Sequence, residues 1–486
     1  MARGRLSERL AAEPLVRTAR EALGDGAADE LWIVGGAVRD ALLGRPVTDL
    51  DLTVRGDSQQ VARRLAGVVG GPVFPLSEAF GAWRAMNRGR TWTCDVTEMH
   101  GDGIDADLAR RDFSVNAIAV PLTGGEPHDP QGGIADLESK QLRVLGGPSV
   151  EQSSYADDPL RPLRLARFAT ELDLHPTPDS RRLTQEAAPL VADAAAERVF
   201  AELRRIVSAE RVIDGLELCD QLGLLEVVLP ELHALHGVEQ SHFHHLDVYD
   251  HTIEVLRCQL ALEHDPEGVF GELAEPLDAL MREPLADELS GWQALRFAAL
   301  LHDSGKPATR GVRPDGRVTF IGHDKVGADL IRSLCRRLKT SERLRELIAR
   351  VTRHHLVLGF LVHERPLGRQ RVYQYLERCQ PVEVEVTLLT CADRLATRGK
   401  NAENAIKNHL ELARELMGEA LAWRASPPEP PLRGGELVEE LGIEPGPELG
   451  ELLARLREAS FTGEARTREE ALALARRLRG QNPAER

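Results

Sequence analysis

The first third of the chain alternates short apolar and polar segments, whereas the rest repeats its apolar residues with helical spacing. Residues 31–34 form a short apolar segment typical of a strand, and Gly35 and Gly36 interrupt it. Residues 37–43 have helical composition and stop at a glycine, whereas residues 50–54 alternate in the manner of a strand. The pattern predicts a strand, a glycine turn, a helix and a second strand, in that order.

Two aspartates lie at the start of the second predicted strand. Asp49 and Asp51 are one residue apart, and residues i and i+2 of a strand point to the same face. Neighbouring carboxylates repel each other, and a divalent metal ion between them is the usual remedy. The preceding glycines let backbone N–H groups approach a phosphate. Either feature alone is more often an ordinary turn or a solvated strand edge, but the combination predicts phosphoryl or nucleotidyl transfer.

The later part of the chain divides into helical segments. The pattern turns helical near residue 151, and residues 240–400 are also rich in histidine. Prolines between 427 and 431 predict a linker, and 486 residues exceed a single hydrophobic core. We therefore predict an α+β chain whose four parts are a head of mixed sheet and helices (1–150), an all-α neck (151–238), an all-α histidine-rich domain (239–424) and a helical tail (425–486).

The composition excludes several protein classes. The six cysteines are scattered without CxxC spacing, which favours reduced thiols in a cytoplasm over a zinc finger. No stretch of eighteen apolar residues is present, and residues 1–13 lack the apolar segment of a secretory signal. We therefore expect a cytoplasmic protein that does not span a membrane. The sequence carries no signal for an oligomeric state.

Several motifs of the first 205 residues resemble those of a known family. GGAVRD (35–40) followed by DLDLTV (49–54) resembles the head of the class II tRNA nucleotidyltransferase and poly(A) polymerase family, within the polymerase-β-like superfamily. DLARRDFSVNAIA (107–119) is similar to the family's sugar- and triphosphate-recognition motif, and DDPLRPLRLAR (157–167) is similar to its nucleotide-selecting motif. ERVFAEL (197–203) is similar to the helix at the end of the family's head and neck.

The resemblance implies a catalytic set and a nucleotide-binding set in the head. The catalytic carboxylates would be Asp49, Asp51 and Asp95, of which the first two would hold Mg²⁺. The residues near the triphosphate and sugar would be Gly35, Gly36, Arg39, Arg111 and Asn116. The implied activity is template-independent addition of CMP and AMP, from CTP and ATP, to the 3′ end of tRNA.

A selectivity group is implied in the neck. A carboxylate accepts from an exocyclic amine and an arginine donates to a ring nitrogen or carbonyl, so Asp158 and Arg161 would imitate a Watson–Crick edge. The spacing i to i+3 predicts that both lie on one helix face, with Arg164 as a third member. The alternative is an exposed helix salt bridge. The net charge of −16 requires any tRNA contact to come from a local patch, and the neck candidates are Arg161, Arg164, Arg167, Arg181, Arg182, Arg204 and Arg205.

One segment departs from the family pattern. Only TEMHGDGIDA separates Val96 from Asp107, whereas CCA-adding members usually have a longer, arginine-containing loop that helps the change from CTP to ATP. Members that add only CC lack that loop. A CC-adding or poly(A)-adding enzyme is therefore an alternative to full CCA addition.

His251, the pair His302-Asp303 and Asp393 follow one another in the histidine-rich segment, and this order resembles the HD phosphohydrolase superfamily. The resemblance implies that these four residues are the core metal ligands, with His323, His354 and His355 supplying a second metal or contacting phosphate. Imidazole and carboxylate ligands suit Ni, Mn, Co, Fe or Mg, and such a site would activate water against a phosphoester. His244, His245 and His363 are interpreted as structural. The implied substrates are 2′,3′-cyclic phosphates or 2′-phosphates at damaged tRNA ends. The alternatives are an HD phosphohydrolase whose head only docks RNA, and a non-catalytic tRNA-binding protein.

Overall fold

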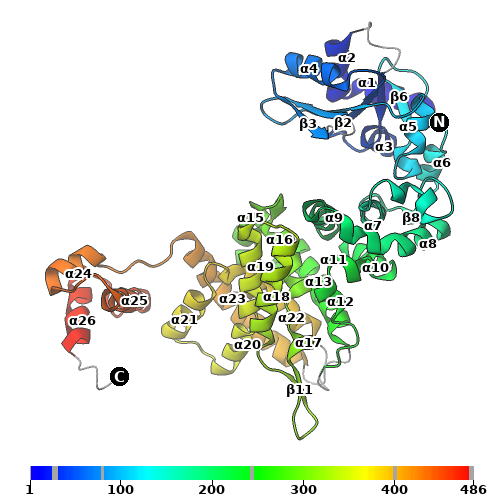
Figure 1. The fold of residues 1–486 in the computed structure, drawn as a ribbon. Coiled ribbons are helices and arrows are strands. Elements are labelled where there is room, and N and C mark those ends of the chain that lie inside the picture. Colours follow the sequence, from blue (N-terminus) through cyan, green and yellow to red (C-terminus); the bar gives the residue numbers. More distant parts are fainter. Residues whose placement is uncertain (1, 25–30, 78–80, 241–245, 398–401, 481–486) are drawn as a thin grey trace. The chain divides into compact units, whose positions relative to one another are not determined.

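A computed structural model describes residues 2–24, 31–77, 81–240, 246–397 and 402–480. The chain divides into two compact units, residues 1–228 and 229–486, each with its own core (Figure 1). The first unit joins a mixed sheet to a group of helices, and the second consists almost entirely of helices. The predicted α+β class is therefore confirmed. The bounds of the four predicted parts remain a prediction.

A six-stranded sheet of order β3-β4-β5-β2-β1-β6 forms the centre of the head. Its strands are β1 (Leu31–Val34), β2 (Leu50–Val54), β3 (Val73–Ser77), β4 (Ala82–Met86), β5 (Thr93–Glu98) and β6 (Ala119–Pro121). β2 runs antiparallel to β1 and parallel to β5, which makes the sheet mixed. β2 therefore lies in the interior of the sheet, with its residues flanked on both sides.

The predicted strand, turn, helix and strand are confirmed at the start of the sheet. β1 leads through Gly35, whose φ is 66°, into α3 (Gly36–Leu43). A positive φ is easily adopted only by glycine. Gly44 ends the helix in the left-handed conformation, and β2 follows. Asp49 lies one residue before β2 and is exposed, whereas Asp51 is its second residue.

Helices cover the sheet of the head. They are α1 (Ala2–Ala12), α2 (Pro14–Leu23), α4 (Ser58–Val69), α5 (Ile104–Ala109) and α6 (Gly133–Glu138), with a 3-10 turn η2 (Ser114–Asn116). α4 packs on β4 and β5, and α2 packs on α4. Apolar residues of α4 at helical spacing, such as Val61 and Leu65, are buried in this contact.

The neck is a group of helices in the same unit. It contains η3 (Val150–Gln152), η4 (Ser154–Ala156), α7 (Arg161–Leu172), α8 (Pro178–Ala187), η5 (Ala188–Asp193), α9 (Ala196–Ser208), α10 (Val212–Gln221) and α11 (Leu224–Val228). A short parallel pair, β7 (Gln141–Leu142) and β8 (His175–Pro176), ties it to the end of the head. α7 packs against both α9 and α10.

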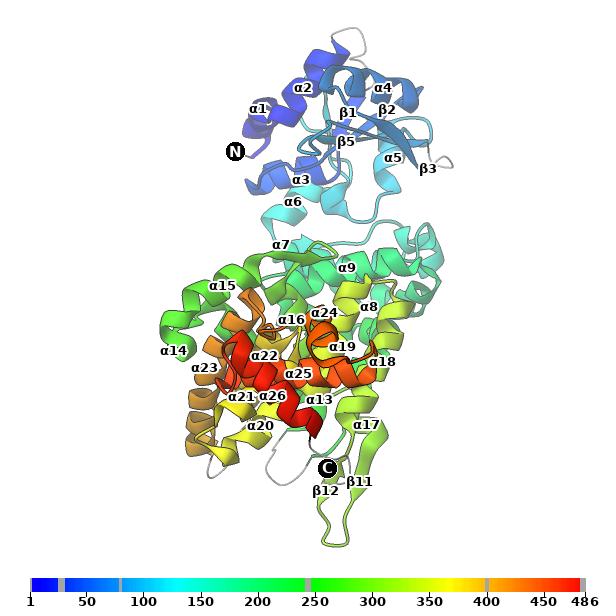
Figure 2. The same cartoon turned by 90° about the vertical axis from the view of Figure 1, so that its left-hand side faces the viewer.

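The second unit has a helical core followed by a tail (Figure 2). Its helices are α12 (Pro230–His233), α13 (Val248–His264), α14 (Glu267–Phe270), α15 (Ala274–Arg282), α16 (Gly291–Leu301), α17 (Lys306–Thr309), α18 (His323–Arg337), α19 (Glu342–His354), α20 (Val357–Leu361), α21 (Arg369–Cys379), α22 (Glu383–Ala396), α23 (Ala402–Ala425), α24 (Gly434–Leu441), α25 (Pro447–Thr462) and α26 (Arg468–Gly480). Short elements between them are η6 (Gly271–Leu273), β9 (Pro284–Ala286), β10 (Leu289–Ser290), β11 (Arg310–Val312), β12 (Val318–Phe320) and η7 (Val362–Glu364).

The core of this unit forms around α13, α16 and α22, and α19 packs on α16. α16 is buried along almost its whole length, as its nearly continuous apolar sequence predicts. The tail has a small core of its own, which includes Leu437, Leu456 and Leu474. Within the residues that the structure describes, no helix combines the length and apolarity needed to cross a membrane.

Candidate active sites

The acidic group of the head lies on two neighbouring parallel strands. Asp51 on β2 is the register partner of Asp95 on β5, and Asp49 directly precedes β2. Burial and the neighbouring Asp95 carboxylate raise the pKa of Asp51 from 3.8 to about 6, against the opposing attraction of Arg111. The three predicted carboxylates are therefore brought together. A divalent cation would offset both the burial and the repulsion by Asp95 that raise the pKa of Asp51, so this donor set fits such an ion.

Arg84 is a site residue that the sequence did not reveal. It lies on β4 opposite Asp95 and holds that carboxylate through two contacts, Nε to Oδ1 at 2.6 Å and Nη2 to Oδ2 at 2.7 Å. The hydrogen bond to Asp95, together with the charges of Asp49 and Asp51, raises the pKa of Arg84. This guanidinium is one of two cations next to the acidic group, and Arg111 is the other. Only the antiparallel pairing of β4 with β5 places Arg84 there, and no local motif indicates such a pairing.

The glycine turn lies against the same carboxylate. A Cβ atom at Gly35 would stand 3.0 Å from Asp51 Oδ2 and 3.2 Å from Arg111 Nη1, and the backbone of Gly36 donates a hydrogen bond to Asp51. Arg111 also donates to Asp107 Oδ2 at 3.0 Å. The glycine pair therefore leaves room beside the acidic group, and a cation at Arg111 borders that space.

Replacement of Gly35 by alanine is expected to impair the head specifically. The positive φ costs about 1–2 kcal/mol for a residue with a Cβ, and displacing the Asp51 carboxylate by ~1 Å reduces activity up to ~100-fold. Gly70→Ala is the matched control, because Gly70 has a φ of 68° and open space where its Cβ would lie. Denaturant unfolding and nucleotide incorporation are the measurements. Equal loss of incorporation in both variants would contradict a role at the acidic group.

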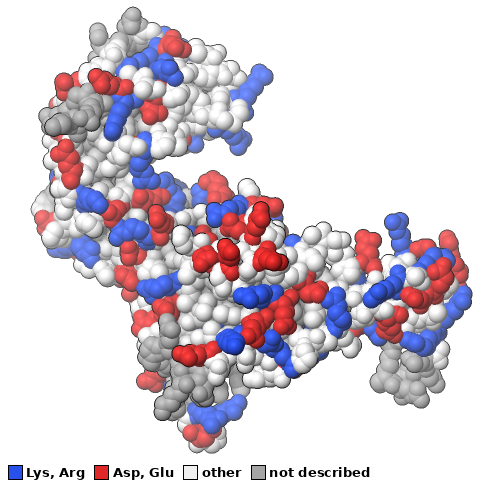
Figure 3. Space-filling model, turned by 180° about the vertical axis from the view of Figure 1, so that it is seen from behind, with Lys and Arg blue, Asp and Glu red and all other residues white. Residues whose placement is uncertain are grey.

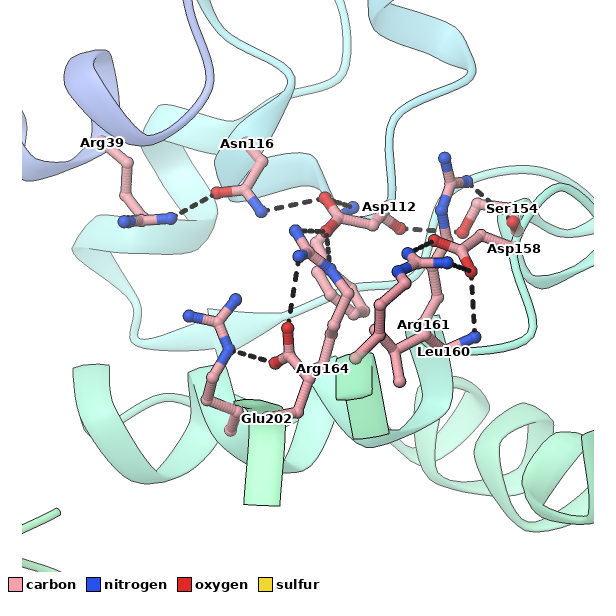
Figure 4. A network of polar contacts seen from close by, with 12 residues as sticks. Arg39, Asp112, Asn116, Ser154, Asp158, Leu160, Arg161, Arg164 and Glu202 are labelled. Atoms are coloured by element: carbon pink, nitrogen blue, oxygen red, sulfur yellow. Dashed lines mark hydrogen bonds and ion pairs between the residues drawn. The ribbon is translucent and has the colours of Figure 1, made fainter. Parts of the chain in front are cut away.

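A chain of polar contacts joins the head to the neck (Figure 4). Arg39 Nη1 donates to Asn116 Oδ1 at 2.7 Å, and Asn116 Nδ2 donates to Asp112 Oδ1 at 2.9 Å. Asp112 accepts two bonds from Arg164 at 3.0 and 2.7 Å, and Arg164 also lies 3.5 Å from Glu202 of α9. Arg39, Asn116 and Arg164, all predicted to bind the nucleotide, therefore belong to one network that includes residues of both the head and the neck.

Asp112 is the centre of this network. Burial alone would raise the pKa of Asp112, but Arg164 and Asn116 outweigh it and lower that pKa to about 2. The same contact, with Glu202, raises the pKa of the buried Arg164 guanidinium. The pair is charged at all ordinary pH values and fixes the start of α7 against the head. Asp112 belongs to the motif at 107–119, so its position in the sequence already carried the signal.

The predicted selectivity pair is placed differently from the expectation. α7 begins at Arg161, so Asp158 lies in the turn before the helix, and the expected shared helix face is wrong. Asp158 accepts from Arg198 of α9 at 2.6 and 3.2 Å and from the backbone N–H of Leu160. The residues 158 and 160 are separated by a proline, and the Asp158 side chain caps this turn instead of continuing the helix.

Arg161 points toward the backbone of the turn rather than toward Asp158. Its Nη1 donates to the carbonyl oxygens of Ser154 and Arg110 at 2.7 and 3.0 Å (Figure 4). Burial lowers the pKa of Arg161, against the attraction of Asp112. In this conformation both members of the pair are engaged with the protein, and a nucleobase would replace these contacts.

The neck arginines that were candidates for an RNA-binding patch are largely paired. Arg164, Arg167, Arg182 and Arg205 each contact a carboxylate, and Arg181 donates to Gln221. Figure 3 likewise shows basic and acidic side chains interleaved over the face in view. The arginine count of the neck therefore overstates the cationic surface that it offers.

The second unit gathers two groups of metal-ligand types. One group is His251, His302 and Asp393, and the other is Asp303, His323 and His355. Their ligand atoms lie within 4.8 Å of one another in each group. Asp303 connects the groups, because its Oδ2 is 3.2 Å from His302 Nε2 and its Oδ1 is 3.4 Å from His323 Nε2. All four predicted core ligands therefore meet.

Backbone carbonyls orient three of the imidazoles. Nδ1 of His302, His323 and His355 lies 2.9, 2.7 and 2.6 Å from the carbonyl oxygen three residues earlier. A carbonyl only accepts, so each Nδ1 carries the proton and each Nε2 has its lone pair free for a metal ion. His302 Nε2 is buried without a hydrogen-bond partner among the described residues. This unpaired imidazole nitrogen fits a bound metal.

A lysine lies next to the two ligand groups. Lys306 Nζ contacts Asp303 Oδ2 at 2.6 Å. Burial would raise the pKa of Asp303, but His302 and Lys306 outweigh it and hold that pKa well below its usual value. Burial and His302 lower the pKa of His355 to about 4, which keeps this imidazole neutral. Lys306 belongs to the HDSGKP segment, and the sequence interpretation gave it no role.

The predicted histidine pair separates at the end of α19. His355 belongs to the second group, whereas His354 belongs to neither group of described residues. Successive helical residues point about 100° apart, so only one of two adjacent histidines reaches a given site. Burial and three arginines lower the pKa of His354 to about 4. His244 and His245 lie outside the described residues. His363 lines a pocket beside the centre instead of serving only as packing.

The fold and the two sites define a nucleotidyltransferase head joined to a helical domain with a metal centre. Family models for the poly A polymerase head domain, the probable RNA and SrmB-binding site of polymerase A and the HD domain match residues 31–143, 173–235 and 248–398. The chain belongs to the tRNA nucleotidyltransferase and poly(A) polymerase family. The resemblance stated from the motifs is thereby confirmed.

Two relatives and one solved structure illustrate this kinship. The chain is 35% identical to an A-adding tRNA nucleotidyltransferase of Deinococcus radiodurans, over 93% of this chain and 96% of the relative. It is also 35% identical to a CC-adding tRNA nucleotidyltransferase of Thermus thermophilus, over 93% and 94%. A structure of the Thermotoga maritima CCA-adding enzyme complexed with tRNA shares the fold, with a TM-score of 0.59, 20% identity and coverage of 97% and 98%.

Proposed function

We propose that this protein adds CMP, AMP or both to the 3′ end of tRNA without a nucleic-acid template, from CTP and ATP. The observation that carries the proposal is the placement of Asp51 beside Asp95, with the glycine turn and Arg111 bordering the same space. The names of both relatives support tRNA as the substrate. A head that only docked RNA would not require Asp51 and Asp95 as neighbours on paired strands with Asp49 directly before one of them.

The residues divide the work by their chemistry. Asp49 and Asp51 would hold Mg²⁺, which would supply Lewis acidity toward an RNA 3′-hydroxyl and positive charge for the triphosphate, and Asp95 would complete the acidic group. The glycine backbone and Arg111 grip the triphosphate. The Arg39, Asn116 and Asp112 chain positions the sugar, because its amide and guanidinium donors are fixed by their neighbours. Asp158 and Arg161 read the base once their present contacts open.

A partial activity is the second candidate, and the connection after β5 favours it. This connection is short, and two hydrogen bonds hold it against the end of β2. Met99 N–H donates to Val54 O at 2.8 Å, and Arg55 Nη2 donates to Asp102 O at 2.9 Å. α5 begins at Ile104. A segment held in this way supplies few residues for a change from CTP to ATP. Both relatives add only part of the CCA end by their names.

Nucleotide incorporation into three tRNA substrates tests the proposal. The substrates end at the discriminator base, after CC and after C, and each receives labelled CTP or ATP with Mg²⁺. A CC-adding enzyme labels the first substrate with CTP but does not label the CC-ended substrate with ATP. An A-adding enzyme labels the CC-ended substrate with ATP but does not label the first substrate with CTP. Sequential labelling by both identifies full CCA addition. Absence of labelling from all three would refute the transferase proposal.

For the second unit we infer a metal-dependent phosphohydrolase. The unpaired His302 Nε2, within the two groups of imidazole and carboxylate ligands, supports a transition metal such as Ni, Mn, Co or Fe, because imidazole suits these ions. The metal, when bound, would activate water toward a phosphoester. Elemental analysis of the purified protein and hydrolysis of 2′,3′-cyclic AMP after metal loading are the tests. A protein that binds no metal at this centre would refute the inference.

A further inference from the structure

A two-stranded hairpin, formed by β11 and β12, projects from the helices of the second unit. The strands are antiparallel, with Arg310 opposite Phe320 and Val312 opposite Val318. Figures 1 and 2 both show the hairpin extending beyond the helices next to it, with its turn at the far end. Residues 312–317 are exposed. Because an isolated two-stranded hairpin is only marginally stable in water, this one needs support at its base.

Residues of the metal centre provide that support. The carbonyl oxygen of Phe320, at the end of β12, accepts a hydrogen bond from His323 Nδ1 at 2.7 Å. Lys306 Nζ lies 5.4 Å from the centre of the Phe320 ring and 2.6 Å from Asp303 Oδ2. β12 also packs on α17. The hairpin is therefore anchored at one end, whereas its turn presents exposed side chains to a partner.

The hairpin is basic, although the chain is acidic. Three arginines and a single acid, Asp315, lie within residues 310–320, whereas the whole chain has a net charge of −16. Arg313 N–H donates to Arg317 O at 2.9 Å, so these two arginines are neighbours at the turn. Arg310 lies on the same hairpin, nearer its base. The hairpin therefore gathers positive charge at a projecting point of an acidic molecule.

Strong ion pairs do not occupy these arginines. Arg317 lies 3.4 Å from Asp315, Arg310 lies 3.5 Å from Glu239, and all four side chains are exposed. No carboxylate among the described residues pairs with Arg313. Exposed ion pairs contribute little to stability, so another anion can replace these carboxylates. The neck arginines are largely paired, and the hairpin supplies the local cationic surface that an acidic RNA-binding protein requires.

We propose that the β11–β12 hairpin binds the phosphate backbone of RNA through Arg310, Arg313 and Arg317. Guanidinium groups donate paired hydrogen bonds to phosphate oxygens, and backbone contacts of this kind are independent of base sequence. A projecting hairpin reaches phosphates while the acidic remainder of the chain stays away from them. The proposal rests on the tRNA substrate proposed above and assigns a contact surface for it in the second unit.

An anionic membrane is the competing partner for such a hairpin. Val312 and Ile321 are 60% and 78% exposed, and apolar side chains beside arginines also suit a lipid surface. A membrane is an extended surface, however, so it would meet the acidic remainder of the chain together with the hairpin. Charge complementarity therefore favours RNA, and lipid vesicles form the second arm of the test.

Filter binding of labelled tRNA to the full chain, over a series of KCl concentrations at constant Mg²⁺, tests the proposal. The hairpin variant combines Arg310→Gln, Arg313→Gln and Arg317→Gln. We expect it to bind tRNA about 10- to 100-fold more weakly than the wild type at low salt, because charged hydrogen bonds to phosphate are lost. The slope of log affinity against log salt concentration should become shallower by ~2–3, since each phosphate contact contributes ~0.7–0.9.

Two further proteins serve as controls. Arg313→Lys keeps the positive charge and should keep the salt dependence of the wild type. The matched control removes three exposed arginines of the same unit that lie outside the hairpin, Arg257→Gln, Arg336→Gln and Arg343→Gln. This control should bind tRNA with the affinity and slope of the wild type. Nucleotide incorporation at saturating tRNA should be equal in all variants, because the hairpin contains no residue of the head.

The outcomes separate this inference from the proposed function. A hairpin variant with wild-type affinity and slope, or an equal loss in the matched control, would overturn the inference. Binding of the wild type but not of the hairpin variant to phosphatidylglycerol vesicles, with equal tRNA binding by both, would assign the hairpin to a membrane instead. A wild type that binds no tRNA refutes the proposed substrate, whereas tRNA binding that does not depend on the hairpin refutes this inference alone.

Discussion

Asp51→Asn is expected to abolish nucleotide incorporation and, at the same time, to stabilise the metal-free protein at pH 7. The first effect follows because the amide loses the charge that binds Mg²⁺, and such an interaction contributes several kcal/mol, or ~100-fold or more in rate. The second effect follows because Asp51 is destabilising when ionised beside Asp95. Incorporation of labelled nucleotide and thermal unfolding in EDTA measure the two effects on one protein.

The sign of the stability effect follows from the pKa. Folding raises the pKa of Asp51 from 3.8 to about 6, so the folded protein binds a proton that the unfolded chain releases between these pH values. The wild type therefore loses stability as the pH rises from about 4 to about 6. The pKa shift corresponds to a loss of folding free energy on the order of 2 kcal/mol, a value reduced because solvent screens the partly exposed side chain. Asp51→Asn should lose this pH dependence.

The control for this prediction is an exposed acid of the same head. Asp102→Asn changes the net charge equally, and Asp102 is an exposed residue of the connection after β5 that is not among the groups that shift the pKa of Asp51. It should leave incorporation unchanged. An Asp51→Asn protein that incorporates nucleotide normally would remove the basis of the transferase proposal. Phosphoester hydrolysis by the second unit should persist in Asp51→Asn.

Asp303→Asn is expected to remove metal from the second unit and to abolish phosphoester hydrolysis. Asp303 faces both ligand groups, with His302 on one carboxylate oxygen and His323 on the other. Its loss therefore weakens both groups, and the rate should fall ~100-fold or more. Metal content by elemental analysis and hydrolysis of 2′,3′-cyclic AMP are the measurements. Nucleotide incorporation by the head should be retained.

Asp329→Asn is the matched control, because Asp329 is an exposed acid on α18 whose described partner is Arg332. It should retain both metal and hydrolysis. Loss of both activities in Asp51→Asn, or in Asp303→Asn, would contradict two independent sites. Retention of metal in Asp303→Asn would show that the two groups do not form the centre.

Local patterns predicted the elements that carry both sites. The glycine turn, α3 and β2 followed from apolar spacing and from glycine chemistry, because neighbouring residues determine these elements. The side-by-side placement of Asp51 and Asp95 was suggested by resemblance, and the parallel pairing of β2 with β5 provides its physical basis. In the second unit, the resemblance to the HD superfamily implied the ligand set of His251, His302, Asp303 and Asp393.

The sequence by itself determined the class of fold, the strand and helix that carry the acidic group, and the residue types of the metal centre. Only the tertiary structure placed Arg84 on Asp95, moved Asp158 out of α7 to Arg198, and chose His355 over His354. The physical reason is range: turns and helices depend on residues a few positions apart, whereas these contacts depend on strand pairing and helix packing between distant segments.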